Sequence, residues 1–148
     1  MREELKLRLL KHITFLEQEM KDYAKFERLS GKEYREVADK RRNVERWVEN
    51  IINSSIDISK VMLTLEGIRL PDTYKDIVKH LSLIGNFGEG DMERLSRWVS
   101  LRNIISHEYL DIRWTSIQKF VAETRSLYED FLNKVKGYLE RKMKEDKE

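Results

Sequence analysis

The sequence contains no cysteine, a single proline and only six glycines among its 148 residues. Without cysteine the chain can form neither a disulfide nor a thiolate metal site, which fits a protein of a reducing compartment. No apolar run approaches the roughly 18 residues of a membrane span, and the N-terminus lacks the apolar segment of a signal peptide. We therefore expect a cytoplasmic protein without a membrane segment.

Charged residues make up 38% of the chain and hydrophobic residues 40%, with a formal net charge of +2. Such a mixture is typical of helices with exposed charged faces. Because the net charge is small, RNA binding would need a local basic patch rather than an overall positive field. No cluster of histidines or carboxylates has the spacing of a metal site, so we expect neither a metal nor a cofactor.

Apolar residues recur at three- and four-residue steps, which is the pattern of amphipathic helices. In the first helix they are Leu5, Leu9, Ile13, Leu16, Met20 and Tyr23. We expect helices over residues 2–28, 32–65, 73–84 and 91–107 and from 114 onward, with an exit loop at 109–112 and a frayed tail at 141–148. The prediction is one domain over residues 1–148, an all-α antiparallel bundle of about five helices.

Four short signals set the expected helix boundaries. Glycines at Ser30-Gly31 and Glu66-Gly67 predict the ends of the first and second helices, since glycine favours the left-handed C-terminal position. Thr73, with Asp76 three residues later, predicts the start of the third helix by a capping box. Asp91 is expected to cap the fourth helix.

The segment from Arg102 to Tyr109 combines polar residues that are suited to chemistry. At about 100° per residue, Leu101, Ile104 and Ile105 share an apolar arc. The opposite arc carries Arg102, Asn103, Ser106, His107 and Tyr109. Glu108 falls within the apolar arc, which predicts that the regular helix ends there.

Arginine and histidine together permit phosphoryl chemistry without a metal. The guanidinium of Arg102 matches phosphate oxygens, and the imidazole of His107 can transfer a proton near neutral pH. Together they can activate an RNA 2′-hydroxyl and stabilise charge on phosphorus. By residue type alone the pattern is weak, because helix-end arginines usually form ion pairs and single histidines are usually structural.

Two other charged features leave alternatives open. Asp57 lies between Ile56 and Ile58, where an unpaired buried carboxylate would be costly, so we expect a nearby cation, with Arg102 a candidate. The basic stretch Lys40-Arg41-Arg42 is either a solvated helix face or a surface that contacts RNA.

The motif of Arg102, Asn103, His107 and Tyr109 resembles the signature of the HEPN superfamily, and specifically of the HepT toxin family. Other segments are similar in the same order, across residues 37–121: Arg42-Asn43-Val44-Glu45-Arg46, Ile51 to Ile58, Leu70-Pro71-Asp72-Thr73-Tyr74, and Met92 to Tyr109 followed by Leu110-Asp111-Ile112. The resemblance implies a HEPN-like helical bundle that forms a symmetric homodimer. The helix faces near Trp47 or Trp98 are candidates for its interface.

The resemblance also implies a function. It is that of a metal-independent endoribonuclease toxin, which cleaves tRNA or mRNA with Arg102 and His107 as catalytic residues and Asn103 in support. The implied partner is an MntA-like minimal nucleotidyltransferase antitoxin, which in related systems attaches AMP to the motif tyrosine, here Tyr109.

Two other functions remain open at this point. Some HEPN bundles are similar in fold but serve as non-catalytic partners that bind nucleotide or substrate for a nucleotidyltransferase. A purely structural bundle is the third alternative, but it leaves the polar arc and Asp57 unexplained.

Overall fold

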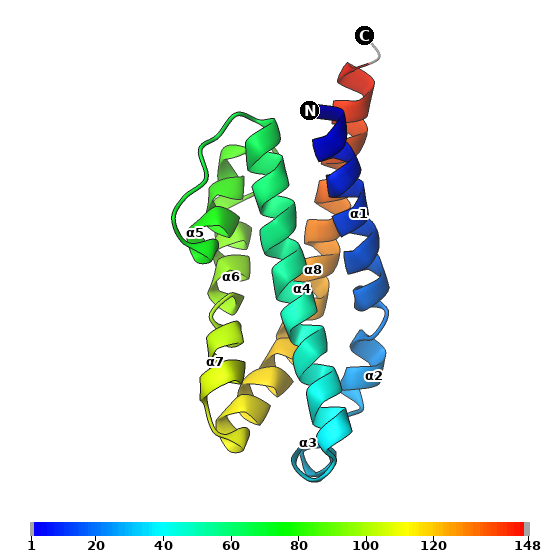
Figure 1. Cartoon of the computed structure of the whole chain (residues 1–148), viewed down its shortest axis with the longest axis vertical. Coiled ribbons are helices and arrows are strands. Elements are labelled where there is room, and N and C mark those ends of the chain that lie inside the picture. Colours follow the sequence, from blue (N-terminus) through cyan, green and yellow to red (C-terminus); the bar gives the residue numbers. More distant parts are fainter. Residues whose placement is uncertain (1, 147–148) are drawn as a thin grey trace.

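The computed structural model describes residues 2–146, and within that range it contains only helices and their connections. Its elements are α1 (Arg2–Met20), α2 (Tyr23–Glu27), α3 (Gly31–Glu36), α4 (Ala38–Leu65), α5 (Tyr74–Lys79), the 3₁₀ helix η1 (His80–Leu83), α6 (Glu89–Trp98), α7 (Leu101–His107) and α8 (Leu110–Glu145). The chain runs along α1 and α2, returns along α4, descends through α6 and α7, and returns again along α8 (Figure 1). The predicted all-α antiparallel bundle is confirmed.

The chain has more helical segments than the five predicted, because four of the predicted helices are divided. Turns interrupt the first at Lys21-Asp22 and the fourth at Val99-Ser100. The second is divided at Val37, whose backbone is extended (φ −111°, ψ 100°) and whose side chain is 41% exposed rather than buried in the predicted stripe. No proline or glycine lies at these breaks, so the periodicity of the sequence does not reveal them.

The prediction that Ser30-Gly31 ends a helix is wrong, because Ser30 instead begins α3. The Ser30 hydroxyl accepts a hydrogen bond from the Glu33 amide, and the Glu33 carboxylate accepts one from the Ser30 amide, which is a complete capping box. Gly31 serves close packing: a Cβ there would lie only 2.8 Å from Nε1 of Trp114 on α8. A larger residue would push α8 away from α3.

The other boundary signals are partly confirmed. Gly67 has a φ of 70° after α4, as predicted. Thr73 caps α5 by accepting a hydrogen bond from the Asp76 amide, but the described residues lack the reciprocal bond of the predicted capping box. Asp91 does not cap α6, because that helix begins at Glu89 with Gly88 at the N-cap position. Asp91 lies within the first turn, where its negative charge stabilises the N-terminus of the helix.

Helix α8 is longer at both ends than the sequence predicts. The expected exit loop at 109–112 is replaced by helix from Leu110, and the expected fraying from 141 does not occur before Glu145. The last turns are held by side-chain contacts: Tyr138 and Lys142 both bind the Glu66 carboxylate, and buried Lys6 pairs with Asp146. Residues 147–148 of the predicted tail lie outside the described residues.

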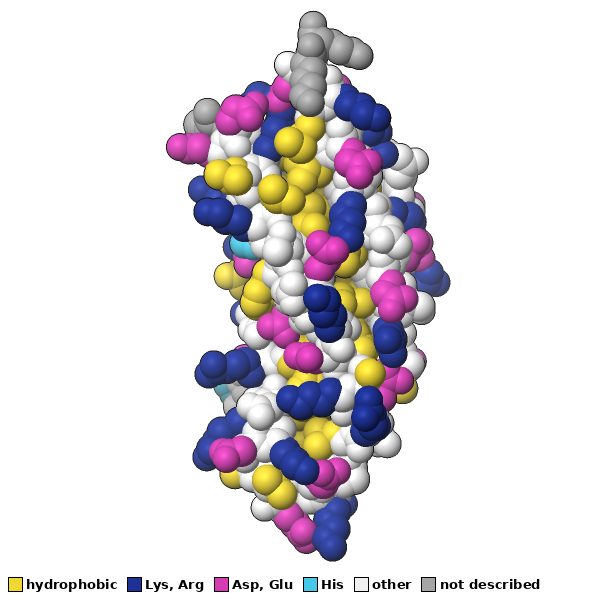
Figure 2. Space-filling view, turned by 90° about the vertical axis from the view of Figure 1, so that its right-hand side faces the viewer, with side chains coloured by type: hydrophobic (Ala, Val, Ile, Leu, Met, Phe, Trp, Pro, Cys, Tyr) yellow, Lys and Arg dark blue, Asp and Glu magenta, His cyan; other side chains and the backbone are white. Residues whose placement is uncertain are grey.

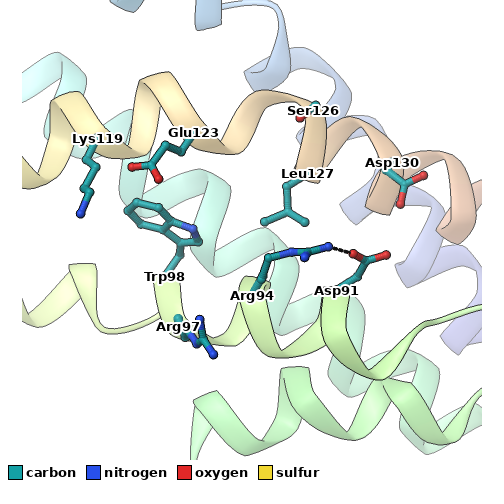
Figure 3. A pocket seen from close by; sticks show the side chains of 9 residues that line it. All are labelled: Asp91, Arg94, Arg97, Trp98, Lys119, Glu123, Ser126, Leu127 and Asp130. Atoms are coloured by element: carbon teal, nitrogen blue, oxygen red, sulfur yellow. Dashed lines mark hydrogen bonds and ion pairs between the residues drawn. The ribbon is translucent and has the colours of Figure 1, made fainter.

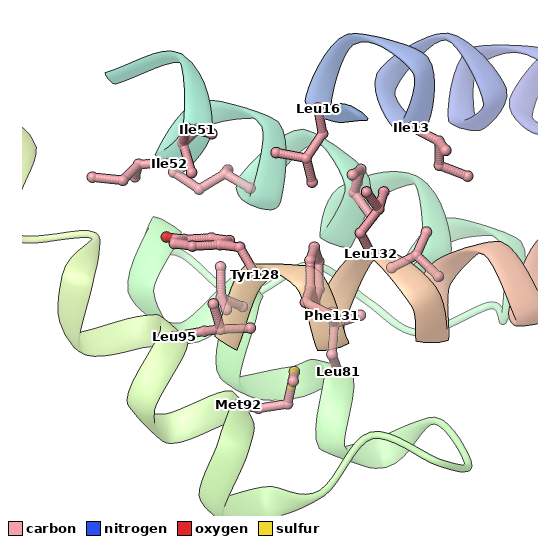
Figure 4. Close-up of a cluster of buried hydrophobic side chains, with 14 of the residues drawn as sticks. Ile13, Leu16, Ile51, Ile52, Leu81, Met92, Leu95, Tyr128, Phe131 and Leu132 are labelled. Atoms are coloured by element: carbon pink, nitrogen blue, oxygen red, sulfur yellow. The ribbon is translucent and has the colours of Figure 1, made fainter. Parts of the chain in front are cut away.

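The core lies where α4 meets the other long helices. Helix α4 is 28 residues long and is buried on much of its circumference, because α1, α5 and α8 pack around it. Figure 4 shows Leu16 of α1, Ile51 and Ile52 of α4 and Tyr128 and Phe131 of α8 converging on one apolar cluster. Closer to α7, Trp47 packs on Tyr23 and Phe120. Trp47 is only 3% exposed, so its indole belongs to the core and not to an exposed interface.

The surface that contains α1 carries both signs of charge. Figure 2 shows Lys and Arg interspersed with Asp and Glu over this face, with a line of apolar side chains between them. This mixture agrees with the small net charge of +2 and offers no broad positive field on that side. None of the helices in the described residues has the length and apolarity needed to cross a membrane.

Candidate functional site

The predicted motif forms its own short helix. Helix α7 buries Leu101 and Ile105 in the core, while Asn103, Ser106 and His107 are exposed, as the two predicted arcs require. The helix ends at His107, and Glu108 has extended backbone with ψ of 164°. The motif therefore presents its polar residues outward at the junction between α7 and α8.

Among the residues of the motif, Arg102 lines a pocket beside α7. The pocket has a volume of about 260 Å³ and lies between α4, α5 and α7. Its lining residues are Asn53, Ile56, Asp57, Lys60, Tyr74 and Arg102. The guanidinium carbon of Arg102 lies 5.1 Å from the ring centroid of Tyr74, within the range of a cation–π contact.

Asp57 and Arg102 share this pocket, as the sequence led us to expect, but no ion pair joins them in the described part of the chain. The carboxylate is half-buried on α4, at the edge of the core. Its supporting role therefore remains a prediction. The charges on the pocket wall are Asp57, Lys60 and Arg102, so positive charge exceeds negative charge by one.

His107 does not share this pocket with Arg102. Within residues 2–146 no hydrogen bond or ion pair links its imidazole to the guanidinium, although both project from one helix of seven residues. Tyr109 immediately precedes α8 as its N-cap residue, and its side chain is 85% exposed. The described residues thus leave His107 and Tyr109 open to solvent and to a second molecule.

A small network, missed in the sequence, fixes the position of α7. Nη1 of Arg113 donates a hydrogen bond to the Ile105 carbonyl (3.2 Å) and lies 3.4 Å from a carboxylate oxygen of Glu45 on α4. The hydroxyl of buried Tyr34 donates to the same carboxylate. Burial, and then the bond to Glu45, raises the pKa of Tyr34 well above its usual value, which keeps it a donor. Arg113 therefore ties the last turn of the motif helix to α4.

The basic stretch on α4 is occupied by structural contacts. Lys40 pairs with Glu33, and Arg42 lies 3.5 Å from Asp39. Arg41 donates to the backbone carbonyls of Tyr34 and Arg35. Since Lys40 and Arg41 brace the junction of α3 and α4 and Arg42 pairs within α4, the solvated-face interpretation is favoured over a dedicated RNA surface.

A larger concavity lies between α6 and α8, away from Arg102. It has a volume of about 650 Å³, and the indole of Trp98 forms part of its wall (Figure 3). Its charged lining residues are balanced: Arg94, Arg97 and Lys119 against Asp91, Glu123 and Asp130. Arg94 pairs with Asp91 across one end, as drawn in Figure 3. We refer to this concavity as the α6–α8 cleft.

The residues around Arg102 left a partial signal in the sequence. Asn53, Asp57 and Lys60 follow one another at steps of four and three, which places three polar side chains on one face of α4. Tyr74 left no such signal, because its spacing suits the apolar stripe of α5, yet it is 48% exposed. Among the described residues, no group of three or more histidines and carboxylates is arranged to hold a metal ion.

Comparison with known families adds an independent observation. A family model described as "Ribonuclease HepT-like" matches residues 15–135, which includes the whole motif, the pocket around Arg102 and the α6–α8 cleft. A search of curated proteins found no match to the chain.

Proposed function

Because the chain belongs to the HepT-like ribonuclease family, we propose that it is a metal-independent endoribonuclease toxin that acts on tRNA or mRNA. The observation that carries the proposal is the arrangement of the motif on α7. Its apolar side is buried in the core, while Arg102 lines a pocket and His107 is exposed on the same helix. Residues held on a rigid helix can keep the geometry that proton transfer and phosphate binding require.

In this mechanism His107 removes the proton of a 2′-hydroxyl, which attacks the adjacent phosphorus, and the bond to the 5′-oxygen of the next nucleotide breaks. The products are a 2′,3′-cyclic phosphate and a 5′-hydroxyl. Arg102 binds the phosphate oxygens and stabilises the charge that builds up on them. Asn103, exposed one residue further along α7, orients the phosphate or the imidazole.

A general acid must also protonate the leaving 5′-oxygen, and the single motif histidine of one chain does not supply both a base and an acid at once. We propose that a symmetric homodimer brings two motifs to one cleft. The solvent exposure of His107 supports this proposal, because its imidazole is accessible to the partner's substrate.

We further propose an MntA-like nucleotidyltransferase antitoxin that silences the toxin by attaching AMP to Tyr109. The exposed phenol of Tyr109 is accessible to such an enzyme. The added phosphate would compete with the RNA phosphate for Arg102. Mass spectrometry of the chain after incubation with the antitoxin and ATP should show one added AMP. Its absence from a Tyr109→Phe variant would locate the modification.

The test of the nuclease is cleavage of a mixed tRNA and mRNA pool in EDTA by the wild-type chain and by His107→Ala. We expect the wild type to produce 2′,3′-cyclic phosphate ends and the variant to lose at least about 100-fold in rate. An intact RNA pool, with wild-type protein that is folded and free of AMP, contradicts the nuclease.

A second candidate function is a non-catalytic partner that binds nucleotide or substrate for a nucleotidyltransferase. The separation of His107 from the pocket that contains Arg102 favours it, since a phosphate can bind there without meeting the imidazole. Binding of nucleotide to intact chain, without any RNA cleavage, would distinguish this candidate from the first.

A further inference from the structure

Two cations from different helices converge on one aromatic ring in the pocket around Arg102. The ammonium nitrogen of Lys60 on α4 lies 4.8 Å from the ring centroid of Tyr74, and the guanidinium carbon of Arg102 on α7 lies 5.1 Å from it. Both distances are within the range in which a ring attracts a cation. The Tyr74 ring of α5 thus holds two positive side chains beside one another.

The electrostatics of this arrangement favour a bound anion. In residues 2–146 neither Lys60 nor Arg102 forms an ion pair with a carboxylate, and Asp57 is the one acidic residue among those that line the pocket. Two like charges repel one another, and an anion shared between them offsets that repulsion. A guanidinium offers a planar fork of donors and an ammonium offers a compact charge, and both are common ligands of phosphate.

We propose that Lys60 and Arg102 together hold one phosphate of the RNA strand, and that Tyr74 positions the two cations for it. This inference rests on the proposed function, because it adds a second phosphate-binding residue to the site of Arg102. Lys60 contacts the substrate directly, with the amide of Asn53 available as a further donor on the same face of α4. Tyr74 is a positioning residue that acts through its ring.

The test measures RNA binding separately from cleavage. All proteins carry His107→Ala, and binding of a short, labelled single-stranded RNA is followed by fluorescence anisotropy at salt concentrations from about 50 to 200 mM. We expect Lys60→Gln, which keeps most of the aliphatic stem, to weaken binding about tenfold, the effect of a lost charge-assisted hydrogen bond. The slope of log Kd against log salt should fall by about 0.7, the value for one lost phosphate contact.

Four further variants separate charge, ring and surface effects. Lys60→Arg should restore most of the affinity and the full salt slope, because it restores the cation. Tyr74→Phe should bind as the parent does, whereas Tyr74→Leu should weaken binding by less than Lys60→Gln, since both cations remain. Lys11→Ala, which removes one exposed lysine from α1 on another side of the bundle, should leave the slope unchanged.

The outcomes distinguish the two proposals. A Lys60→Gln protein that melts like its parent and binds RNA with the parent's Kd and salt slope overturns this inference. The same holds if the His107→Ala parent binds no RNA at any salt concentration. If binding depends on Lys60 but the wild-type chain cleaves no RNA, the phosphate subsite stands and only the nuclease fails.

Discussion

The α6–α8 cleft and the pocket around Arg102 differ in size and in charge, and the smaller one has the features of a site. The cleft is about 650 Å³ and the pocket about 260 Å³. In the cleft three cations face three carboxylates, and Arg94 already pairs with Asp91 and Arg97 with nearby Glu93. In the pocket Lys60 and Arg102 both lie against the Tyr74 ring, and within residues 2–146 neither pairs with a carboxylate, although Asp57 also lines the pocket. An excess of charge without a partner indicates a ligand better than volume does.

The comparison predicts that removing an arginine from the pocket reduces RNA cleavage much more than removing one from the α6–α8 cleft. Arg102→Ala should reduce RNA cleavage by at least about 100-fold, because it removes stabilisation of the transition state. Arg94→Ala, which removes the same side chain from the α6–α8 cleft, should change the rate by less than about twofold. Single-turnover cleavage assays of the two variants, with melting curves to confirm folding, make this measurement. Equal losses in both would show that RNA uses the cleft as much as the pocket.

The second prediction concerns the network of Arg113, Glu45 and Tyr34, which holds α7 in place beside the pocket. Arg113→Met removes the donor to the Ile105 carbonyl and leaves Glu45 without its cation, in a region where both side chains are mostly buried. We expect a loss of about 2 kcal/mol in the free energy of unfolding, measured by urea titration.

The matched control for Arg113 is Arg125→Met. Arg125 pairs with Glu27 and Glu129, but these side chains are about half-exposed, so its removal should cost at most about 1 kcal/mol. If Arg113→Met costs no more than this control, the network does not stabilise α7.

The sequence predicts the helices well but not their interruptions. Periodicity depends on which face of a helix is buried, and Leu9, Ile13, Leu16 and Ile51 are buried as their spacing indicates. The break at Val37 has a different origin. Glu33, Lys40 and Arg41 brace that corner across the change of direction, and such contacts depend on tertiary packing. Local helix propensity does not indicate such contacts.

The candidate site, like the fold, could be predicted only in part from the sequence. The polar arc of α7 follows from helix geometry, and Arg102 and Asp57 do line one pocket. Lys60 and Tyr74 lie 42 and 28 residues before Arg102 in the sequence, so their meeting depends on how α4 and α5 pack against α7. Packing angles between helices vary with side-chain shape and cannot be read from spacing alone.

A third prediction concerns the contacts of Glu66, at the end of α4, with Tyr138 and Lys142 of α8, and should give the smallest effect. Burial raises the pKa of Glu66, but hydrogen bonds from Lys142 and Tyr138 outweigh it, so the net pKa of this carboxyl lies below its usual value. A depressed pKa in the folded state adds stability above the unfolded value of about 4.3, and this stability is lost as the pH falls through the folded pKa. Glu66→Gln should therefore cost about 1 kcal/mol at neutral pH. The variant should also lose less stability than the wild type on acidification to about pH 3.

Thermal melting at both pH values makes this comparison, with Glu140→Gln as the control, since Glu140 is an exposed carboxylate on α8. The control should melt like the wild type at each pH, because an exposed carboxylate gains little on folding. RNA cleavage at neutral pH should be unchanged in both variants, since neither alters the charge around Arg102. If the wild type and Glu66→Gln lose equal stability on acidification, Glu66 does not stabilise the contact between the ends of α4 and α8. A fall in cleavage in Glu66→Gln would mean that a charge outside the pocket around Arg102 controls the reaction. That result would contradict the conclusion that the cations of this pocket form the site.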